Sequence, residues 1–307
     1  MLYKFFIALS LVFSLQHAAA QDIPLYEGAI PNSRPAPEGY AEKDSLGRIF
    51  RVTKPVLMPF FPREGKANGT AVLIFPGGGY FLLSMPACEE IARALADSGI
   101  TAFIVKYRLP SDVIMKDKST GPLQDALSAI RLVRRRAAEW GIDPHRVGLM
   151  GLSAGGHLAS MVATQQERTA IPNPENTDLR PDFLALLYPV IIYDPEVPRT
   201  RENLIGKNPS AETLRQYSTD QSVSSKTPPA FLVHAADDSV IPLKNTLAFF
   251  NALIQHNVKT ELHVLQTGDH GFALTDLPSG GQWFQMFQSW LRENGWLTTT
   301  GNSRPLP

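Results

Sequence analysis

The chain of 307 residues is long enough for one large domain or two small ones, and an α/β core of this size is readily stable. Its 29 lysines and arginines balance its 29 aspartates and glutamates, so the composition argues against a nucleic-acid or anionic-membrane binder. The single cysteine, Cys88, excludes a disulfide framework and is expected to be a small buried residue.

The first twenty residues have the features of a cleavable secretory signal peptide. Lys4 supplies the positive charge, residues 5–15 the apolar stretch, and three alanines at residues 18–20 the cleavage site. An apolar stretch of eleven residues is too short to cross a hydrocarbon core of about 30 Å as a helix. We therefore expect a secreted or periplasmic protein without a membrane span.

The mature chain is predicted to form one catalytic domain with short extensions. Residues 21–62 are predicted to form an N-terminal arm with few internal contacts, rich in proline and glycine up to residue 39, followed by a β-meander. The predicted domain covers residues 63–297, and residues 298–307 form a tail.

From residue 72 onward, apolar strand patterns alternate with amphipathic helix patterns. Such alternation predicts an α/β fold with a mostly parallel central sheet and helices on both faces. Two segments, residues 165–181 and 193–229, interrupt it and are expected to be substrate-shaping loops. Strands are predicted at 72–75, 100–108, 146–150, 183–192, 230–236 and 261–267, and helices at 86–99, 122–141, 154–164, 242–255 and 281–294.

The stretch GLSAGGHLAS places a serine between two glycines, after a predicted strand and before a predicted helix. Such a strand-to-helix turn crowds neighbouring Cβ atoms, so glycine is needed at Gly151 and Gly155, and the serine oxygen is presented above the sheet. The context predicts that Ser153 is a nucleophile. The alternative is a small residue in a glycine-rich loop.

A serine nucleophile needs a base and a carboxylate, which follow it in the order acid, then histidine, in this type of fold. His270, in the polar loop TGDHGF after the last predicted strand, is the predicted base. Asp238 is the predicted acid because it begins the stretch Asp-x-x-Ile-Pro that leads into a helix, with Asp237 as the alternative. The other downstream histidines fit structural positions better: His157, His234, His256 and His263.

A glycine triplet after an early strand, in FPGGGY, is suited to an oxyanion hole because its amides can turn inward without Cβ obstruction. The predicted donors are the amide of Ala154 and that of Gly78 or Gly79. No histidine or cysteine spacing predicts a metal site, and no phosphate-loop lysine follows the triplet.

With these residues assembled, the chain resembles the α/β-hydrolases and, within them, secreted bacterial carbohydrate esterases of the acetylxylan-esterase-like and feruloyl-esterase-like group. The matching stretches span most of residues 70–295. They are IFPGGGY, VKYRLP, DALSAIRLVRRRAAEWGIDPHRVGLMGLSAGGHLAS, RPDFLALLYPVI, TPPAFLVHAADDSVIPLKN and GDHGF. Pro76 stands where related lipases and esterases carry histidine.

The resemblance implies cofactor-free hydrolysis of small esters on plant polysaccharides, with acetyl groups first and feruloyl groups as an alternative. Tyr80, Tyr188 and Trp283 are candidate pocket residues, although core aromatics are an equally good reading. A prolyl-oligopeptidase-like peptidase and a non-catalytic carbohydrate-binding protein are the rival functions. The expected partner is an acylated polysaccharide or oligosaccharide, and the oligomeric state stays open.

Overall fold

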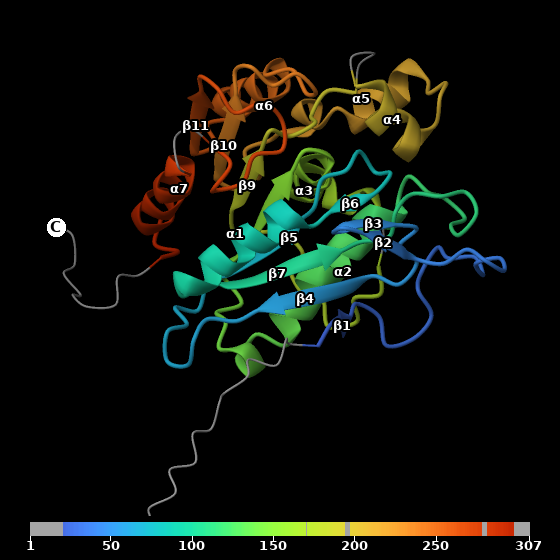
Figure 1. Ribbon diagram of the computed structural model, residues 1–307, viewed down its shortest axis with the longest axis horizontal. Coiled ribbons are helices and arrows are strands. Elements are labelled where there is room, and N and C mark those ends of the chain that lie inside the picture. The colour runs from blue at the N-terminus through green and yellow to red at the C-terminus, as the bar shows by residue number, and fades with distance from the viewer. Residues whose placement is uncertain (1–20, 170, 194–196, 278–280, 298–307) are drawn as a thin grey trace, which may run out of the picture.

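The computed structural model describes residues 21–169, 171–193, 197–277 and 281–297. The predicted signal peptide and C-terminal tail lie outside these ranges. The described residues form an α/β structure around an eight-stranded sheet with the strand order β1-β4-β7-β5-β8-β9-β10-β11 (Figure 1). The six strands from β7 to β11 run parallel, while β1 and β4 pair antiparallel at one edge.

The elements follow the predicted alternation of strands and helices, with additional short strands, short helices and 3₁₀ turns. The main sheet consists of β1 (Ile23–Pro24), β4 (Val56–Phe60), β5 (Ala71–Phe75), β7 (Thr101–Lys106), β8 (Val147–Leu152), β9 (Leu184–Leu187), β10 (Ala230–Ala235) and β11 (Thr260–Leu265). A second sheet contains β2 (Lys43–Ser45), β3 (Arg48–Phe50) and β6 (Leu83–Ser84). The α-helices are α1 (Pro86–Asp97), α2 (Gly121–Arg135), α3 (Ala154–Gln165), α4 (Pro198–Ile205), α5 (Ala211–Tyr217), α6 (Lys244–Gln255) and α7 (Gln282–Glu293), with 3₁₀ turns at Ala138–Trp140, Gln166–Arg168 and Thr219–Ser222.

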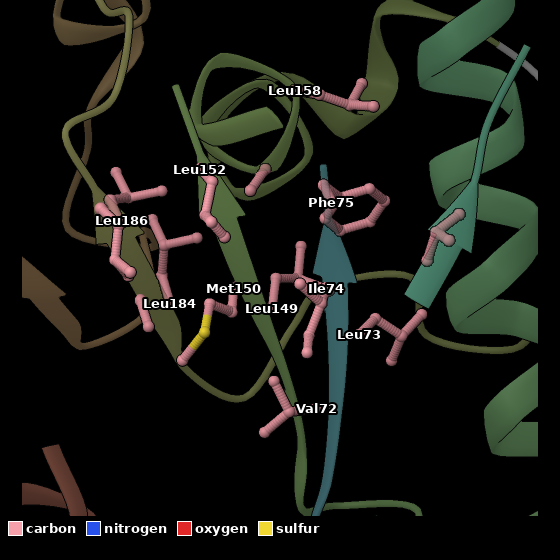
Figure 2. Close-up of a cluster of buried hydrophobic side chains, with 14 of the residues drawn as sticks. Val72, Leu73, Ile74, Phe75, Leu149, Met150, Leu152, Leu158, Leu184 and Leu186 are labelled. Carbon is pink, nitrogen blue, oxygen red and sulfur yellow. The ribbon is translucent and has the colours of Figure 1, made fainter. Parts of the chain in front are cut away.

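The centre of the main sheet is apolar on both faces, which explains the continuous hydrophobic runs in the sequence. Every residue of β5, β8, β9 and β10 is buried. Figure 2 shows side chains of β5, β8 and β9 meeting in this core, with Leu158 of α3 nearby. Figure 1 shows α1 and α2 on opposite faces of the sheet. Burying each large apolar side chain stabilises the fold by roughly 1.5–3 kcal/mol, so this layer fixes the strands that carry the site.

The N-terminal arm is bound to the core through contacts that its composition did not predict. Arg108 and Asp125 form an ion pair at 2.7 Å with both side chains fully buried. The same guanidinium donates to the Pro31 carbonyl and the Ser33 hydroxyl, and the Tyr26 hydroxyl donates to Asp125. A buried arginine has five N–H donors to satisfy, and the arm provides acceptors for them.

The strands of the β-meander predicted after the arm belong to two different sheets. β2 and β3 form a hairpin that pairs with β6 outside the main sheet, while β4 joins the main sheet beside β7. The segment 193–229 contains α4, α5 and a 3₁₀ turn in addition to loops. Within the described ranges, no helix is long and apolar enough to cross a membrane.

Candidate active site

Ser153 occupies a sharp turn between β8 and α3, with φ 55° and ψ −118°. A positive φ is uncommon for a residue other than glycine and is a source of local strain. A Cβ on Gly151 would lie 2.4 Å from the Gly155 carbonyl oxygen, and a Cβ on Gly155 would lie 2.0 Å from that of Phe75. Only glycine therefore fits on either side of the serine.

The structure brings Ser153, His270 and Asp238 together in one hydrogen-bonded chain. His270 Nε2 lies 2.9 Å from Ser153 Oγ, and His270 Nδ1 lies 2.7 Å from Asp238 Oδ2. Because the carboxylate accepts from Nδ1–H, the neutral ring presents Nε2 as the acceptor for the serine proton. Residues 117 positions apart in the sequence thus meet at the carboxyl ends of the parallel strands.

Asp238 is held as a carboxylate by several donors. Its Oδ1 accepts from the amides of Val240 and Ile241, and its Oδ2 faces both His270 and the buried His234, the latter at 3.1 Å. Burial favours the neutral acid, but hydrogen bonds from His234, His270 and the Ile241 amide outweigh it and hold the pKa well below its usual value. The carboxylate is therefore ionised throughout the neutral range.

The alternative acid, Asp237, points elsewhere. Its Oδ1 accepts from the amide of Asp269 at 2.8 Å, so it supports the loop that carries His270 without touching the ring. Asp269 has a positive φ of 48°, and its own carboxylate accepts from the amide and hydroxyl of Ser239. These contacts fix the His270 loop against the end of β10.

The glycine triplet lies directly beside Ser153. A Cβ on Gly77 would lie 3.0 Å from the Cβ of Ser153, and one on Gly78 would lie 2.2 Å from the Leu82 carbonyl oxygen. The Gly79 carbonyl accepts from the side chain of Asn203 at 2.8 Å. Ala154 begins α3, so its amide has no carbonyl partner within the helix. The glycine loop and the first turn of α3 therefore both lie beside Ser153.

Tyr80 does not line the cleft beside Ser153 and instead borders an adjoining hollow. The side chain is 1% exposed, and its hydroxyl bonds Nδ1 of His157 at 2.9 Å. The other ring nitrogen of His157 donates to the Tyr217 carbonyl at 2.8 Å, which makes Nδ1 the acceptor and the Tyr80 hydroxyl the donor. Burial lowers the pKa of His157 to about 4, so the ring is neutral at neutral pH.

Trp283 is a core aromatic, the alternative that the sequence left open, whereas Tyr188 lies at the cleft. Trp283 is fully buried on α7, where its indole donates to the Ala273 carbonyl at 2.8 Å. Tyr188 lines the cleft, its ring meeting that of His270 edge to face at 4.9 Å. Its hydroxyl donates to the Phe272 carbonyl, so Tyr188 buttresses the histidine loop.

The cleft above Ser153 has a volume of about 470 Å³. Its walls come from the glycine loop, from residues 197–200, from Val240 and Ile241, and from Arg48 on β3. Residues 197–200 belong to one of the two segments expected to shape the substrate site, while the other, residues 165–181, borders a different hollow. Arg48 was missed because nothing in the sequence connects the N-terminal hairpin to the serine.

His234 and His263 are accounted for by local contacts. His263 lies 2.6 Å from Glu261, and His234 is buried between Thr246 and the Ile241 carbonyl. In the part of the chain that the structure describes, no group of three or more histidine, cysteine, aspartate or glutamate side chains could hold a metal ion.

Comparison with known families matches residues 59–253 to the BD-FAE family. The chain is 34% identical over 252 residues to an acetylxylan esterase of Xylanibacter ruminicola, covering 80% of this chain and 48% of that protein. It is 32% identical over 209 residues to endo-1,4-beta-xylanase B of Butyrivibrio fibrisolvens, covering 67% of this chain and 33% of that protein. The chain thus spans less than half the length of these two relatives.

Among solved structures, the chain is similar to an acetyl ester-xyloside bifunctional hydrolase from Caldicellulosiruptor lactoaceticus. The TM-score is 0.75 at 34% sequence identity, and the match covers 91% of this chain and 97% of that one. An esterase from Thermogutta terrifontis, 24% identical with a TM-score of 0.69, shares the fold. These neighbours support the α/β-hydrolase type of fold predicted from the sequence.

Proposed function

Because the chain belongs to the BD-FAE family of the α/β-hydrolase type, we propose that it is a serine carboxylesterase acting on acylated carbohydrate. Its substrate is a plant cell-wall polysaccharide such as acetylated xylan, or an oligosaccharide derived from it, and acetyl is the group removed. One observation carries the proposal. The hydroxyl of Ser153 lies 2.9 Å from a histidine that is itself oriented by the Asp238 carboxylate.

In the first step, Ser153 Oγ attacks the ester carbonyl while His270 Nε2 takes the serine proton. Asp238 stabilises the imidazolium that forms, and the amides of Ala154 and of Gly78 or Gly79 hold the oxyanion. Collapse of the tetrahedral intermediate expels the sugar alkoxide, which takes the proton from His270. Water then repeats the sequence on the acyl-enzyme and releases acetate.

The walls of the cleft favour a small acyl group next to Ser153. Gly77 lies close to the serine, since a Cβ on it would lie 3.0 Å from the Cβ of Ser153, and Tyr188 is fixed by its bond to the Phe272 carbonyl. The cleft as a whole is larger than an acetyl group, so the remaining space is available for the sugar. The similarity to an acetylxylan esterase and to an acetyl ester-xyloside hydrolase supports acetyl esters as the first candidate substrate. Feruloyl esters are the second candidate substrate.

The predicted signal peptide supports action outside the cytoplasm, in the periplasm or the surrounding medium, where polysaccharide substrates are encountered. The peptidase alternative has less support. The relatives and solved structures named above are esterases, a xylanase or an acetyl ester-xyloside hydrolase by name.

The test compares wild-type protein with Ser153→Ala on 4-nitrophenyl acetate and on acetylated xylan, glucomannan and pectin, with feruloylated arabinoxylan as the competing substrate. Loss of both the nucleophile and the acyl-enzyme is expected to reduce kcat by about a million-fold. Circular dichroism and thermal unfolding establish that the variant is folded. Retention of most of the wild-type rate, or release of ferulate without acetate, would contradict the proposal.

A further inference from the structure

A second hollow of about 580 Å³ adjoins the cleft above Ser153. The two hollows share the side chain of Phe81, which is 59% exposed and follows the glycine loop. One wall of the second hollow comes from the β2–β3 hairpin and the residues that flank it, and Figure 1 shows this hairpin beside β6 at the edge of the molecule. The lining residues that matter here are Tyr40, Lys43, Phe50, Arg51, Phe81 and Asn203.

The hollow presents aromatic rings in a fixed arrangement. The rings of Phe50 and Phe81 meet edge to face, with centroids 5.6 Å apart and an interplanar angle of 81°. This contact leaves most of Phe81 open to solvent instead of folding it into the core. An exposed phenylalanine at the border of two hollows offers an apolar face, and the C–H face of a pyranose ring is a matching surface.

Lys43 and Arg51 lie on this hairpin or directly beside it, and the neighbouring carboxylates have other partners. Glu42 pairs with Lys106, and Asp44 accepts from the Gly47 amide. Lys43 pairs with Phe50 across the two strands, and the Arg51 guanidinium lies 5.5 Å from the centre of the Tyr40 ring. Within the described ranges, no carboxylate lies at ion-pairing distance from Lys43 or Arg51. None of the described residues that line the hollow is an aspartate or a glutamate.

Arg48 extends this positive surface into the catalytic cleft. It lies on β3 opposite Ser84, and both residues line the cleft that contains Ser153. The hairpin therefore places Arg48 toward the ester, and Lys43 and Arg51 toward the second hollow. Asn203 borders the second hollow and donates to the carbonyl of Gly79, which lines the cleft, so this side chain connects the two hollows.

We propose that the second hollow is a binding subsite for sugar units of the polysaccharide that carry a carboxylate. In this arrangement, a sugar ring rests on Phe81 while Lys43 and Arg51 hold the carboxylate of a uronosyl unit. The ester to be cleaved lies at Ser153, a few sugar units along the same chain. The proposal rests on the proposed esterase function and specifies its substrate class as an acidic, acetylated polysaccharide.

The test measures binding separately from catalysis by using the Ser153→Ala protein. Isothermal titration compares a glucuronosyl-substituted xylo-oligosaccharide with the unsubstituted oligosaccharide of the same length. The double variant Lys43→Gln/Arg51→Gln is added to this background. Its matched control is Arg63→Gln/Lys66→Gln, which removes the same charge from two exposed residues that border neither hollow.

The double variant is expected to weaken binding of the glucuronosyl ligand at least fivefold at low salt, and of the unsubstituted ligand less than twofold. The difference shrinks near 0.5 M salt, where exposed charges are screened over about 4 Å. Phe81→Ala is expected to weaken both ligands, because it removes the stacking surface. Equal effects of the test and control variants, or no preference of the parent for the glucuronosyl ligand, would overturn the proposal.

Failure of the subsite is distinguishable from failure of the esterase function. If the wild-type protein hydrolyses 4-nitrophenyl acetate but does not prefer the glucuronosyl ligand, the subsite alone is refuted. A protein that shows the preference but hydrolyses no ester supports the subsite and refutes the esterase function.

Discussion

The hydroxyl of Tyr80 donates to Nδ1 of His157 over 2.9 Å, joining the residue that follows the glycine triplet to the helix that follows the nucleophile. Tyr80 has a positive φ of 57°, so this bond holds a strained backbone next to the proposed oxyanion donors. Tyr193 stacks on the same imidazole, with ring centroids 4.3 Å apart. The glycine loop and α3 are thereby fixed relative to one another.

Tyr80→Phe is expected to lower kcat on 4-nitrophenyl acetate several-fold with little change in KM, since the loop would position the oxyanion less well than the substrate. Loss of the buried hydrogen bond should also reduce the free energy of unfolding by about 1–3 kcal/mol. The control is Tyr217→Phe, which removes a hydroxyl from the same aromatic stack but from a bond to the Ser119 carbonyl. Equal kinetics for the two variants would argue against a positioning role.

His157 makes stability depend on pH. Its pKa falls from an ordinary value of 6.5 to about 4 on folding because the ring is buried. The unfolded chain therefore binds an additional proton between these values, so the stabilisation is complete above pH 6.5 and is lost as the pH falls toward 4. This group alone should remove about 2 kcal/mol between pH 7 and pH 4.5.

His157→Gln keeps one donor and one acceptor but does not titrate. Urea unfolding of this variant is expected to show a shallower dependence of the unfolding free energy on pH over the same interval. An unchanged slope would indicate that other groups cause the acid sensitivity.

Asp238→Asn should lower kcat by about ten-thousand-fold, because an amide at this position favours the wrong tautomer of His270. Asp237→Asn is the matched control, since Asp237 contacts the Asp269 amide and not the imidazole. Its kcat is expected to stay within a few-fold of the wild type. Steady-state kinetics of the two variants decide between the neighbouring carboxylates.

Gly155→Ala tests the close contact between the nucleophile turn and β5. The added Cβ would lie 2.0 Å from the Phe75 carbonyl oxygen, which belongs to the rigid centre of the sheet. We expect a loss of about 3 kcal/mol or more in unfolding free energy, together with a fall in activity. Gly28→Ala, where a Cβ has nothing within 4 Å, should leave both properties near the wild-type values.

Arg108→Met should destabilise the fold by about 3–5 kcal/mol, because it leaves the Asp125 carboxylate buried without its partner. The double variant Arg108→Met/Asp125→Leu removes both charges and should recover part of that loss. Chemical unfolding measures each value. A double variant no more stable than Arg108→Met would show that the bonds from Arg108 to the arm outweigh the buried charge.

The elements that the sequence predicted well are those whose signals are local. Continuous apolar runs identified the buried strands, and the glycines around Ser153 identified a turn that excludes other residues. The order of Asp238 and His270 after Ser153 was also readable, because strand ends of a parallel sheet meet at one edge. The catalytic roles of these residues stay predictions until the variants are measured.

The aromatic residues show what the sequence could not specify. Tyr80 bonds His157, 77 residues away, and Trp283 bonds Ala273, ten residues earlier, and nothing near either ring in the sequence indicates which way it points. The composition of the arm predicted few contacts within it but could not identify its binding partner Arg108, which comes 77 residues after Pro31. Long-range partners of this kind depend on the packed fold.

The cleft is lined by Arg48, Ser153 and His270, which come from the beginning, middle and end of the domain. A nascent chain therefore contains Ser153 long before it contains His270, and no partial chain ending before residue 270 has both. Ester hydrolysis should accordingly appear late during refolding, after the β10 and β11 segments have joined the sheet. Ester hydrolysis would therefore indicate that folding is complete, and an unfolded chain is expected not to hydrolyse esters.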